Sequence, residues 1–568
     1  MSLDPRDWFL DTAERANDHT RLDDAHPDGQ AWSTGNHARP LVHGATYFAE
    51  LYERIEATRA GDLVLFTDWR GDPDEQLLGT PGSEVAEVLG RADQRGVDVR
   101  GLVWRSHTDR IRFSAEQNAD LADELQESGA ETLLDHRVRT GGSHHQKFVV
   151  IRHRDDPSRD IAYVGGIDLC HSRRDDARHL GDPQPQPMAP EYGATPPWHD
   201  VQLALTGPVV HDVETTFRER WEDPLPLTRD PLKKLRDRLV RRDTTPDPLP
   251  EQAPPPPPVE GGTHAVQLLR TYPDLRWGRD YTFAVGGERS VARGYAKALE
   301  RARRLVYVED QYLWSEDVAT HFVDALRAHP DLHVIAVLPH HPDQSGVSAA
   351  LQYVGRHRAL ARLHEAGQGR FAAYGPENHE GTPVYVHAKT CVMDDAWASI
   401  GSDNFNRRSW THDSELSAAV IDTGDGGEGG DGAEGGGDGS AHSPYARRLR
   451  LTLAAEHLDR QIGPDAYPGD VSALETGRSP ADLDDAVLLE AMADCVEPEA
   501  MFAAFADSAR RLQEWHDDGR TGERPPGRLR PVDPDPMTRV QRALLTGPYR
   551  VLVDPDGRPR TLRRRHRF

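Results

Sequence analysis

The 568-residue chain contains the same arrangement of motifs twice. A strand-like run that ends at Asp68 is followed 77 positions later by His145, and a second run that ends at Asp310 is followed 77 positions later by His387. Two unrelated domains would not easily share both this spacing and the motifs at its ends. We therefore interpret the chain as an internal duplication of one folding unit.

Each copy alternates apolar-periodic helices with short apolar strands. In the first copy the pattern predicts helices over 46–59, 82–95 and 115–128 and strands over 63–68, 97–103 and 131–138. In the second copy it predicts helices over 289–303, 317–328 and 346–366 and strands over 305–310, 332–337 and 369–374. This alternation is typical of α/β units. We expect two similar α/β/α sandwich halves with mainly parallel or mixed sheets, related by a pseudo-twofold axis.

Two segments lack the residues of a core. Residues 244–258 hold eight prolines, which predicts an extended polyproline spacer, and residues 424–439 hold ten glycines and five acids, which predicts a solvated loop. We therefore expect a first half over 1–243, a linker over 244–262, a second half over 263–465 and a C-terminal segment over 466–568. This last segment is predicted to be helical, with a basic tail over 558–568.

The composition of the chain limits the kinds of partner that it can bind. The formal net charge is −26, which argues against a general nucleic-acid partner because a phosphate backbone requires a basic face. Three scattered cysteines predict neither a disulfide framework nor a zinc site. The chain shows no secretory signal and no long apolar stretch, so we expect a cytoplasmic monomer that acts peripherally at membranes.

The clearest chemical signal is a His-x-Lys pair in each copy. On a strand, residues i and i+2 face the same side, so His145 points with Lys147 and His387 points with Lys389. One such pair is commonly a surface coincidence. Here, however, only 5 of the 68 basic residues are lysines, and two of them occupy the matching positions. Two pairs brought together at one interface would form a cationic pocket for a phosphate group.

A small-residue turn follows each pair. Gly165, Gly166 and Asp168 in the first copy correspond to Gly401, Ser402 and Asn404 in the second. Small residues let the backbone approach a ligand closely, and the polar side chain that follows can contact it. A turn of this kind after both pairs strengthens the prediction of one shared site.

These motifs resemble the phospholipase D superfamily, whose mark is a duplicated His-x-Lys-x4-Asp motif. The second copy is complete, with His387, Lys389 and Asp394, followed by Gly401-Ser402, Asn404 and Asn406. The first copy has Arg152 where the aspartate is expected, which puts the local hairpin geometry in question. The stretches TDW (67–69), GGIDLC (165–170), PWHD (197–200), YVEDQY (307–312) and HDSEL (412–416) resemble phospholipase D enzymes themselves, so the likeness covers about 40–225 and 285–460.

The resemblance implies phosphodiester cleavage through a covalent phosphohistidine, without a metal or other cofactor. It makes His145 the nucleophile and His387 the general acid and base, although the residues alone leave this order open. Lys147, Lys389 and Asn404 would bind the phosphoryl oxygens, with Asp168 and Ser409 as further candidates, and Ser409 is equally well explained as a turn cap. We expect Asp200 to orient His145 and Glu415 to orient His387. Structural roles fall to Asp394, Gly165, Gly166, Gly401, Ser402 and Asn406.

Four functions fit these features. The first is a phospholipase D that acts on glycerophospholipids at a membrane surface, with water or an alcohol as acceptor. The second is a cardiolipin synthase-like phosphatidyltransferase. The third is a phosphodiesterase or nuclease, against which the net charge argues. The fourth is an inactive phosphate-binding protein, against which the intact pairs argue. The head group and the balance of hydrolysis and transfer stay open.

Overall fold

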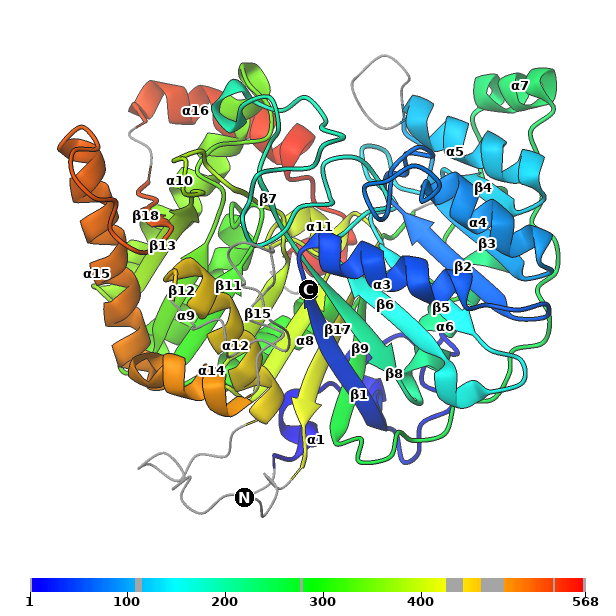
Figure 1. The fold of residues 1–568 in the computed structure, drawn as a ribbon, viewed down its shortest axis with the longest axis horizontal. Coiled ribbons are helices and arrows are strands. Elements are labelled where there is room, and N and C mark those ends of the chain that lie inside the picture. The colour runs from blue at the N-terminus through cyan, green and yellow to red at the C-terminus, as the bar shows by residue number, and fades with distance from the viewer. Residues whose placement is uncertain are drawn as a thin grey trace.

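A mixed sheet runs through the whole molecule (Figure 1). The computed structural model describes residues 3–107, 115–275, 279–424, 443–460, 485–534, 537–564 and 568. Within these residues the sheet has 16 strands in the order β18-β13-β12-β11-β15-β16-β17-β9-β1-β8-β6-β5-β2-β3-β4, with β10 (Glu288–Arg289) paired to β9. The Gly- and Asp-rich loop predicted over 424–439 lies, apart from Gly424, outside the described residues.

The strand order is the same when read outward from the centre in either direction. Strand β1 (Ser33–Val42) pairs antiparallel with β9 (His264–Tyr272), and these two are flanked by β8 (Val201–Thr206) and β17 (Glu415–Asp422). The first half continues with β6 (Ile161–Gly165), β5 (Phe148–Arg152), β2 (Leu63–Asp68), β3 (Asp98–Trp104) and β4 (Glu131–Asp135). The second continues with β16 (Trp397–Gly401), β15 (Thr390–Met393), β11 (Leu305–Glu309), β12 (His333–Val337) and β13 (Phe371–Pro376). The predicted duplication about a pseudo-twofold axis is confirmed.

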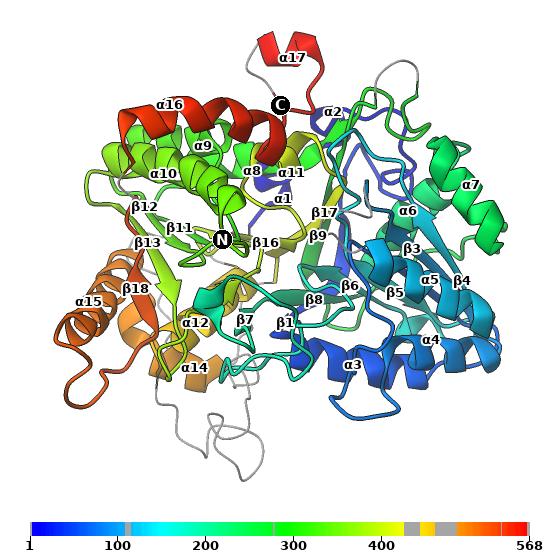
Figure 2. The same ribbon diagram turned by 90° about the horizontal axis from the view of Figure 1, so that it is seen from above.

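Helices cover both faces of each half, as predicted (Figures 1 and 2). The first half carries α3 (Gly44–Glu56), α4 (Val85–Gln94) and α5 (Ala115–Ser128) on one face and α6 (Val209–Trp221) on the other. The second half carries α8 (Ser290–Arg301), α9 (Glu316–Ala328) and α10 (Val347–Gly367) on one face and α12 (Pro444–His457) on the other.

Strand β5 shows why both faces are covered. Its residues Val149 and Ile151 join the apolar cluster under α3, α4 and α5, whereas Phe148 and Val150 join the cluster under α6. Since side chains alternate along a strand and all of these are apolar, the strand must be buried on both faces. The three parallel strands β2, β3 and β4 are likewise buried in a layered α/β arrangement.

A second, very short sheet joins the halves above the main sheet. Strand β7 (Trp198–His199) of the first half pairs in parallel with β14 (Tyr385–Val386) of the second, through Trp198 opposite Tyr385. Each of these strands directly precedes a predicted site residue, Asp200 or His387. The seam between the halves is therefore the place where the predicted site residues meet.

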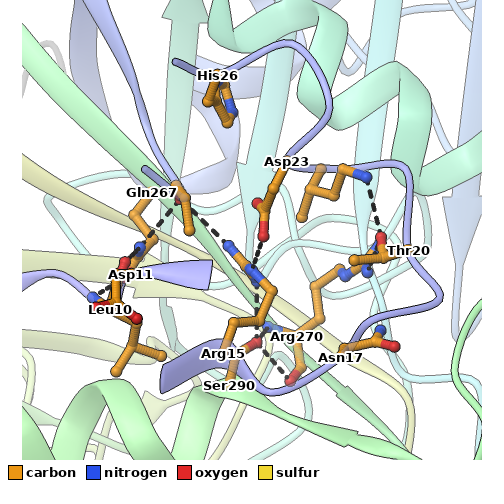
Figure 3. Close-up of polar contacts among 12 residues, drawn as sticks. Leu10, Asp11, Arg15, Asn17, Thr20, Asp23, His26, Gln267, Arg270 and Ser290 are labelled. Atoms are coloured by element: carbon orange, nitrogen blue, oxygen red, sulfur yellow. Dashed lines mark hydrogen bonds and ion pairs between the residues drawn. The ribbon is translucent and has the colours of Figure 1, made fainter. Parts of the chain in front are cut away.

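The N-terminal residues pack against the second half as well as the first (Figure 3). They include α1 (Pro5–Trp8) and α2 (Thr12–Arg15). The buried Arg15 side chain donates from Nε to Asp23 at 2.8 Å and from Nη1 to Glu288 at 3.1 Å. Gln267 in β9 accepts the backbone N–H of Leu10 at 3.0 Å. The N-terminal segment thus fastens the two halves together.

The remaining segments lie on the outside. The proline-rich segment has no helix or strand and is fixed by Trp221 Nε1, which donates to the Asp247 carbonyl at 2.8 Å. The C-terminal segment contains several helices, among them α14 (Asp485–Ala491), α15 (Pro498–Asp517), α16 (Arg539–Pro548) and α17 (Arg560–Arg564). It also contains an edge strand, β18 (Leu529–Pro531), antiparallel to β13.

Candidate active site

Main-chain hydrogen bonds across the seam bring each motif histidine to a segment of the other half. The His145 N–H donates to the Ser414 carbonyl at 2.9 Å, and the His387 N–H donates to the His199 carbonyl at 2.7 Å. Ser414 precedes Glu415 and His199 precedes Asp200. Each histidine therefore lies beside the acid that follows the glycine turn of the opposite half.

The orienting acids are exchanged relative to our expectation. His145 Nδ1 lies 2.9 Å from Glu415 Oε2, and His387 Nδ1 lies 2.7 Å from Asp200 Oδ2. The predicted pairs, Asp200 with His145 and Glu415 with His387, are wrong. The assumption that each acid serves its own half ignored the seam, where the register of β7 with β14 and of 143–145 with Ser414 sets the neighbours.

In both dyads Nδ1 is the ring atom that contacts the carboxylate, so Nε2 is the atom available for chemistry. Burial, followed by the charges of Lys147 and Lys389, holds the pKa of His145 well below its ordinary value. Burial and the Lys389 charge do the same for His387. Both imidazoles are consequently neutral near pH 7 before an anion binds, and a neutral imidazole is the form that can act as a nucleophile.

Both motif lysines are buried close to the dyad histidines. Lys147 Nζ lies 3.6 Å from Asp168 Oδ1, and Lys389 Nζ donates to Gln311 Oε1 at 3.3 Å. Burial and the neighbouring Lys147 charge lower the pKa of Lys389 to about 7, against the opposing effect of Asp200. A bound phosphate would favour the charged form of Lys389.

The residues of the two turns have different surroundings. Asp168 accepts the backbone N–H groups of Trp69 and Arg70 at 3.1 and 3.2 Å, so it ties the loop after β2 to Lys147. Asn404 is buried and its Oδ1 has no hydrogen-bond partner among the described residues. An amide oxygen only accepts, so a contact from Asn404 to a phosphoryl oxygen would have to be donated by its Nδ2 group.

Ser402 and Ser409 both serve the acid of the first dyad. The Ser402 hydroxyl donates to Glu415 Oε2 at 2.6 Å, and the Ser409 side chain also hydrogen-bonds the Glu415 carboxyl group. Burial and the nearby Asp413 raise the pKa of Glu415 to about 8 despite these bonds. Asn406 caps α11 (Arg407–Thr411), because its Oδ1 accepts the Ser409 N–H at 2.7 Å. The turn residues thus fix Glu415 under His145.

Close packing requires glycine at three turn positions. An added Cβ would lie 2.3 Å from Gln202 Oε1 at Gly165, 2.3 Å from Asp200 Oδ1 at Gly166 and 1.8 Å from Ser417 Oγ at Gly401. The backbone of each turn therefore passes directly against the strand that carries the orienting acid of that half.

The two positions of the motif aspartate are built differently. Asp394 accepts the backbone N–H groups of Arg303, Arg304 and Leu305 at 2.6 to 2.9 Å and so caps the entry to β11. Arg152, in the first copy, forms buried ion pairs with Asp160 at 2.8 Å and Glu214 at 2.6 Å. These two ion pairs accommodate the departure from the motif.

A buried histidine cluster, which the sequence did not reveal, lies behind the site. Glu456 contacts His43 at 2.7 Å and His179 at 2.9 Å, and Glu309 contacts His199 at 2.7 Å and His457 at 2.8 Å. Glu309 raises the pKa of His199 to about 10 against the effect of burial. His43, His179, His199 and Glu456 also have the geometry to hold a metal ion. Through the contact of Glu309 with His199, this cluster holds the residue whose carbonyl accepts the His387 N–H.

Two family models match the chain. The model described as "Phospholipase D" matches residues 58–329, and the model described as "Cardiolipin synthase, PLD-like domain" matches residues 295–425. The chain belongs to the phospholipase D superfamily. The superfamily assignment agrees with the motif pairs that meet at the seam.

Curated relatives are distant. The chain is 24% identical over 505 residues to "Phospholipase D alpha 1" of Oryza sativa subsp. japonica, covering 66% of this chain and 61% of that protein. It is 25% identical over 496 residues to "Phospholipase D beta 2" of Arabidopsis thaliana, covering 66% and 53%. The match thus spans less than two thirds of these relatives.

Among solved structures, the phosphatidylserine synthase of Haemophilus influenzae Rd KW20 aligns with a TM-score of 0.45 and 15% identity, covering 68% of this chain and 82% of that one.

Across the described residues, none of the helices combines the length and the apolar character needed to cross a bilayer.

Proposed function

We propose that this superfamily member is a phospholipase D-type phosphodiesterase, which cleaves or exchanges the head group of glycerophospholipids through a phosphohistidine. The observation that carries the proposal is the pair of crossed dyads, His145 with Glu415 and His387 with Asp200, beside two buried lysines. Two imidazoles with free Nε2 atoms beside a phosphate pocket supply a nucleophile and a proton carrier without further groups.

In the first step His145 Nε2 attacks phosphorus, the N–P bond forms and the P–O bond to the head group breaks. His387 donates its proton to the departing head-group oxygen, so this histidine must be charged when substrate is bound. The substrate phosphate and Asp200, 2.7 Å from Nδ1, both favour that charged form.

In the second step water or an alcohol attacks the phosphohistidine from the side that the head group has left. Neutral His387 removes the proton from the acceptor, a new P–O bond forms and the N–P bond to His145 breaks. Water gives phosphatidic acid, and an alcohol gives the exchanged phospholipid. Both histidines then have their original protonation states.

The charge that develops on the phosphoryl oxygens needs fixed donors. Lys147 and Lys389 supply two buried ammonium groups, and the Asn404 side chain supplies a neutral donor. Because these groups are already desolvated and held by neighbouring residues, they need little rearrangement as charge builds up.

The match of residues 295–425 to the model "Cardiolipin synthase, PLD-like domain" favours a second candidate, transfer of a phosphatidyl group to the alcohol of another lipid. The chemistry is the same up to the phosphohistidine, and only the acceptor differs.

The test offers the purified protein phosphatidylcholine with ethanol, phosphatidylglycerol alone and, in parallel, plasmid DNA. Phosphatidylethanol that is absent with His145→Ala and His387→Ala supports the first proposal. Cardiolipin formed from phosphatidylglycerol, with little phosphatidic acid, supports the second. Cleavage of DNA without lipid turnover contradicts both. The matched control is Glu222→Gln, because Glu222 is an exposed acid at the C-cap of α6.

A further inference from the structure

We propose that two exposed apolar helix ridges, on α7 (Pro231–Val240) and on α16 with the turn that follows it, form one docking face for an anionic phospholipid bilayer. The inference extends the proposed function, because it names the surface on which the site would work. It concerns binding alone, however, and can be tested without turnover.

Helix α7 has the composition of an interfacial helix. Leu232, Leu235 and Leu239 follow one another at i, i+3 and i+7, so they form one ridge, and they are 75%, 54% and 77% exposed. The exposed cations Lys234, Arg238 and Arg241 lie beside the ridge. The one acid in the helix, Asp237, turns inward and accepts Arg105 at 2.7 and 2.9 Å. An apolar ridge beside a row of cations is typical of helices that lie in the surface of an anionic bilayer.

A second ridge lies on the other half. Val540 and Leu544 of α16 are 67% and 69% exposed, and Val551 and Leu552 in the following turn are 71% and 67% exposed. The opposite side of this segment is anchored, because Leu545 packs beside Trp314 and Tyr549. The segment therefore presents its apolar residues outward while its inner face is held by the core.

Both ridges are attached to the segments that carry the first dyad. On the α7 side, Arg105 belongs to the loop after β3, in which His107 contacts the Gly142 carbonyl at 2.7 Å, three residues before His145. This connection runs through a salt bridge and a single loop.

On the α16 side, Asp554 accepts the N–H of Arg408 at 3.0 Å, and Arg408 pairs with Asp413 at 2.6 Å. Asp413 in turn accepts the Ser143 N–H at 2.8 Å. Figure 1 shows α7 and α16 at opposite ends of the upper edge of the molecule. A bilayer that contacts both ridges would thus bridge the two halves on one side of the site.

Charge identifies the occupant. The whole chain carries −26, so an anionic bilayer would be repelled by most of its surface. The cations of α7 are concentrated where the leucines are exposed. The cations of this helix match the negative lipid head groups, and its leucines match the apolar interior of the bilayer. Each such cation strengthens binding to an anionic surface by about fivefold.

The test measures co-sedimentation with phosphatidylcholine vesicles and with vesicles that also contain phosphatidylglycerol. The His145→Ala protein is used so that no lipid is consumed. We expect tighter binding to the anionic vesicles, weakened by salt. Leu232→Ser/Leu235→Ser/Leu239→Ser should weaken it at least about tenfold, and so should Val540→Ser/Leu544→Ser. Lys234→Gln/Arg238→Gln/Arg241→Gln should weaken only the anionic preference, by about a hundredfold.

Leu489→Ser is the matched control, because Leu489 is an exposed leucine on α14, at the opposite, lower edge in Figure 1. In the active protein the ridge variants should turn over a short-chain, monomeric phosphatidylcholine at the parent rate. Unchanged vesicle binding by both ridge variants overturns the proposal, as does equal binding of the parent to both vesicle types. A smaller assembly in light scattering, seen only with the ridge variants, would assign the ridges to self-association instead. Loss of lipid turnover by the parent, with vesicle binding intact, would contradict the proposed function and leave this inference supported.

Discussion

The crossed dyads make a sharp prediction about which acid serves which histidine. Glu415→Gln keeps the shape of a buried side chain but removes the carboxyl group that His145 Nδ1 contacts at 2.9 Å. The pKa of Glu415 is raised to about 8 in the free protein, and the positive charge that develops on the ring during attack favours its ionised form. A hydrogen bond to a charged group contributes about 1.5–3 kcal/mol. At about 1.4 kcal/mol per tenfold in rate, formation of the phosphohistidine should slow by about 10- to 150-fold. Asp200→Asn should have an effect of the same size on the step that depends on His387.

A substrate with a good leaving group separates the two steps. Phosphatidyl-p-nitrophenol in detergent micelles releases p-nitrophenolate, which needs no protonation, so the first step no longer depends on the acid function of His387. Stopped-flow absorbance then reports a burst of product followed by slow turnover. We expect Asp200→Asn to keep the burst and slow the turnover, and Glu415→Gln to lose the burst. Asp123→Asn, an acid that is 43% exposed, should change neither phase.

The histidine variants determine the roles independently. If His145→Ala abolishes the burst, Glu415→Gln must slow it and Asp200→Asn must not. If His387→Ala abolishes it, the roles are reversed and Asp200→Asn must be the variant that slows it. A burst that depends on His145 and Asp200 together, with Glu415→Gln unaffected, would refute the crossed pairing.

Three further changes test other parts of the site. Burial lowers the pKa of Lys389 to about 7, so the lysine of the free enzyme loses its charge as the pH rises above 7. The KM for the substrate should therefore increase above pH 7, by up to about tenfold per pH unit. Lys389→Arg stays charged and should remove this pH dependence. Arg152→Ala removes the cation shared by two buried acids and leaves Glu214 with Arg218 and Asp160 with His153. It should lower the free energy of unfolding in urea by about 3 kcal/mol, whereas Arg21→Ala, from an exposed pair, should cost at most about 1 kcal/mol. Gly166→Ala should reproduce the kinetics of Asp200→Asn, because its new methyl group would displace that carboxylate; a burst and turnover equal to those of the parent protein would contradict this packing argument.

Local patterns predicted the fold closely. The helix over 115–128 and the strand over 63–68 have the predicted bounds, since the apolar pattern of each is clear. The equal spacing of Asp68 with His145 and Asp310 with His387 predicted the duplication before any contact was known. In these segments the propensity, the periodicity and the repeat all indicate the same structure.

Contacts between distant segments were harder to foresee. The sequence marked Asp200 and Glu415 as orienting acids but assigned them to the wrong rings, because neighbours across the seam depend on three-dimensional register. The cluster of His43, His199 and Glu456 was not predicted, because these residues lie far apart in the sequence and no short motif links them. The N-terminal segment likewise gave no sign that Arg15 would bind in the second half.

The crossing of the dyads has a consequence for how such a chain could have arisen. Neither half owns a complete pair, since the acid beside His145 belongs to the second half and the acid beside His387 to the first. An ancestral single unit with this geometry could work only as a symmetric two-copy assembly, in which each copy lent its acid to the other. Joining the copies in one chain removes the need for identical sequences. Asp168 can then differ from Asn404 beside the rings, and Arg152 from Asp394 at the motif position farther along the strand.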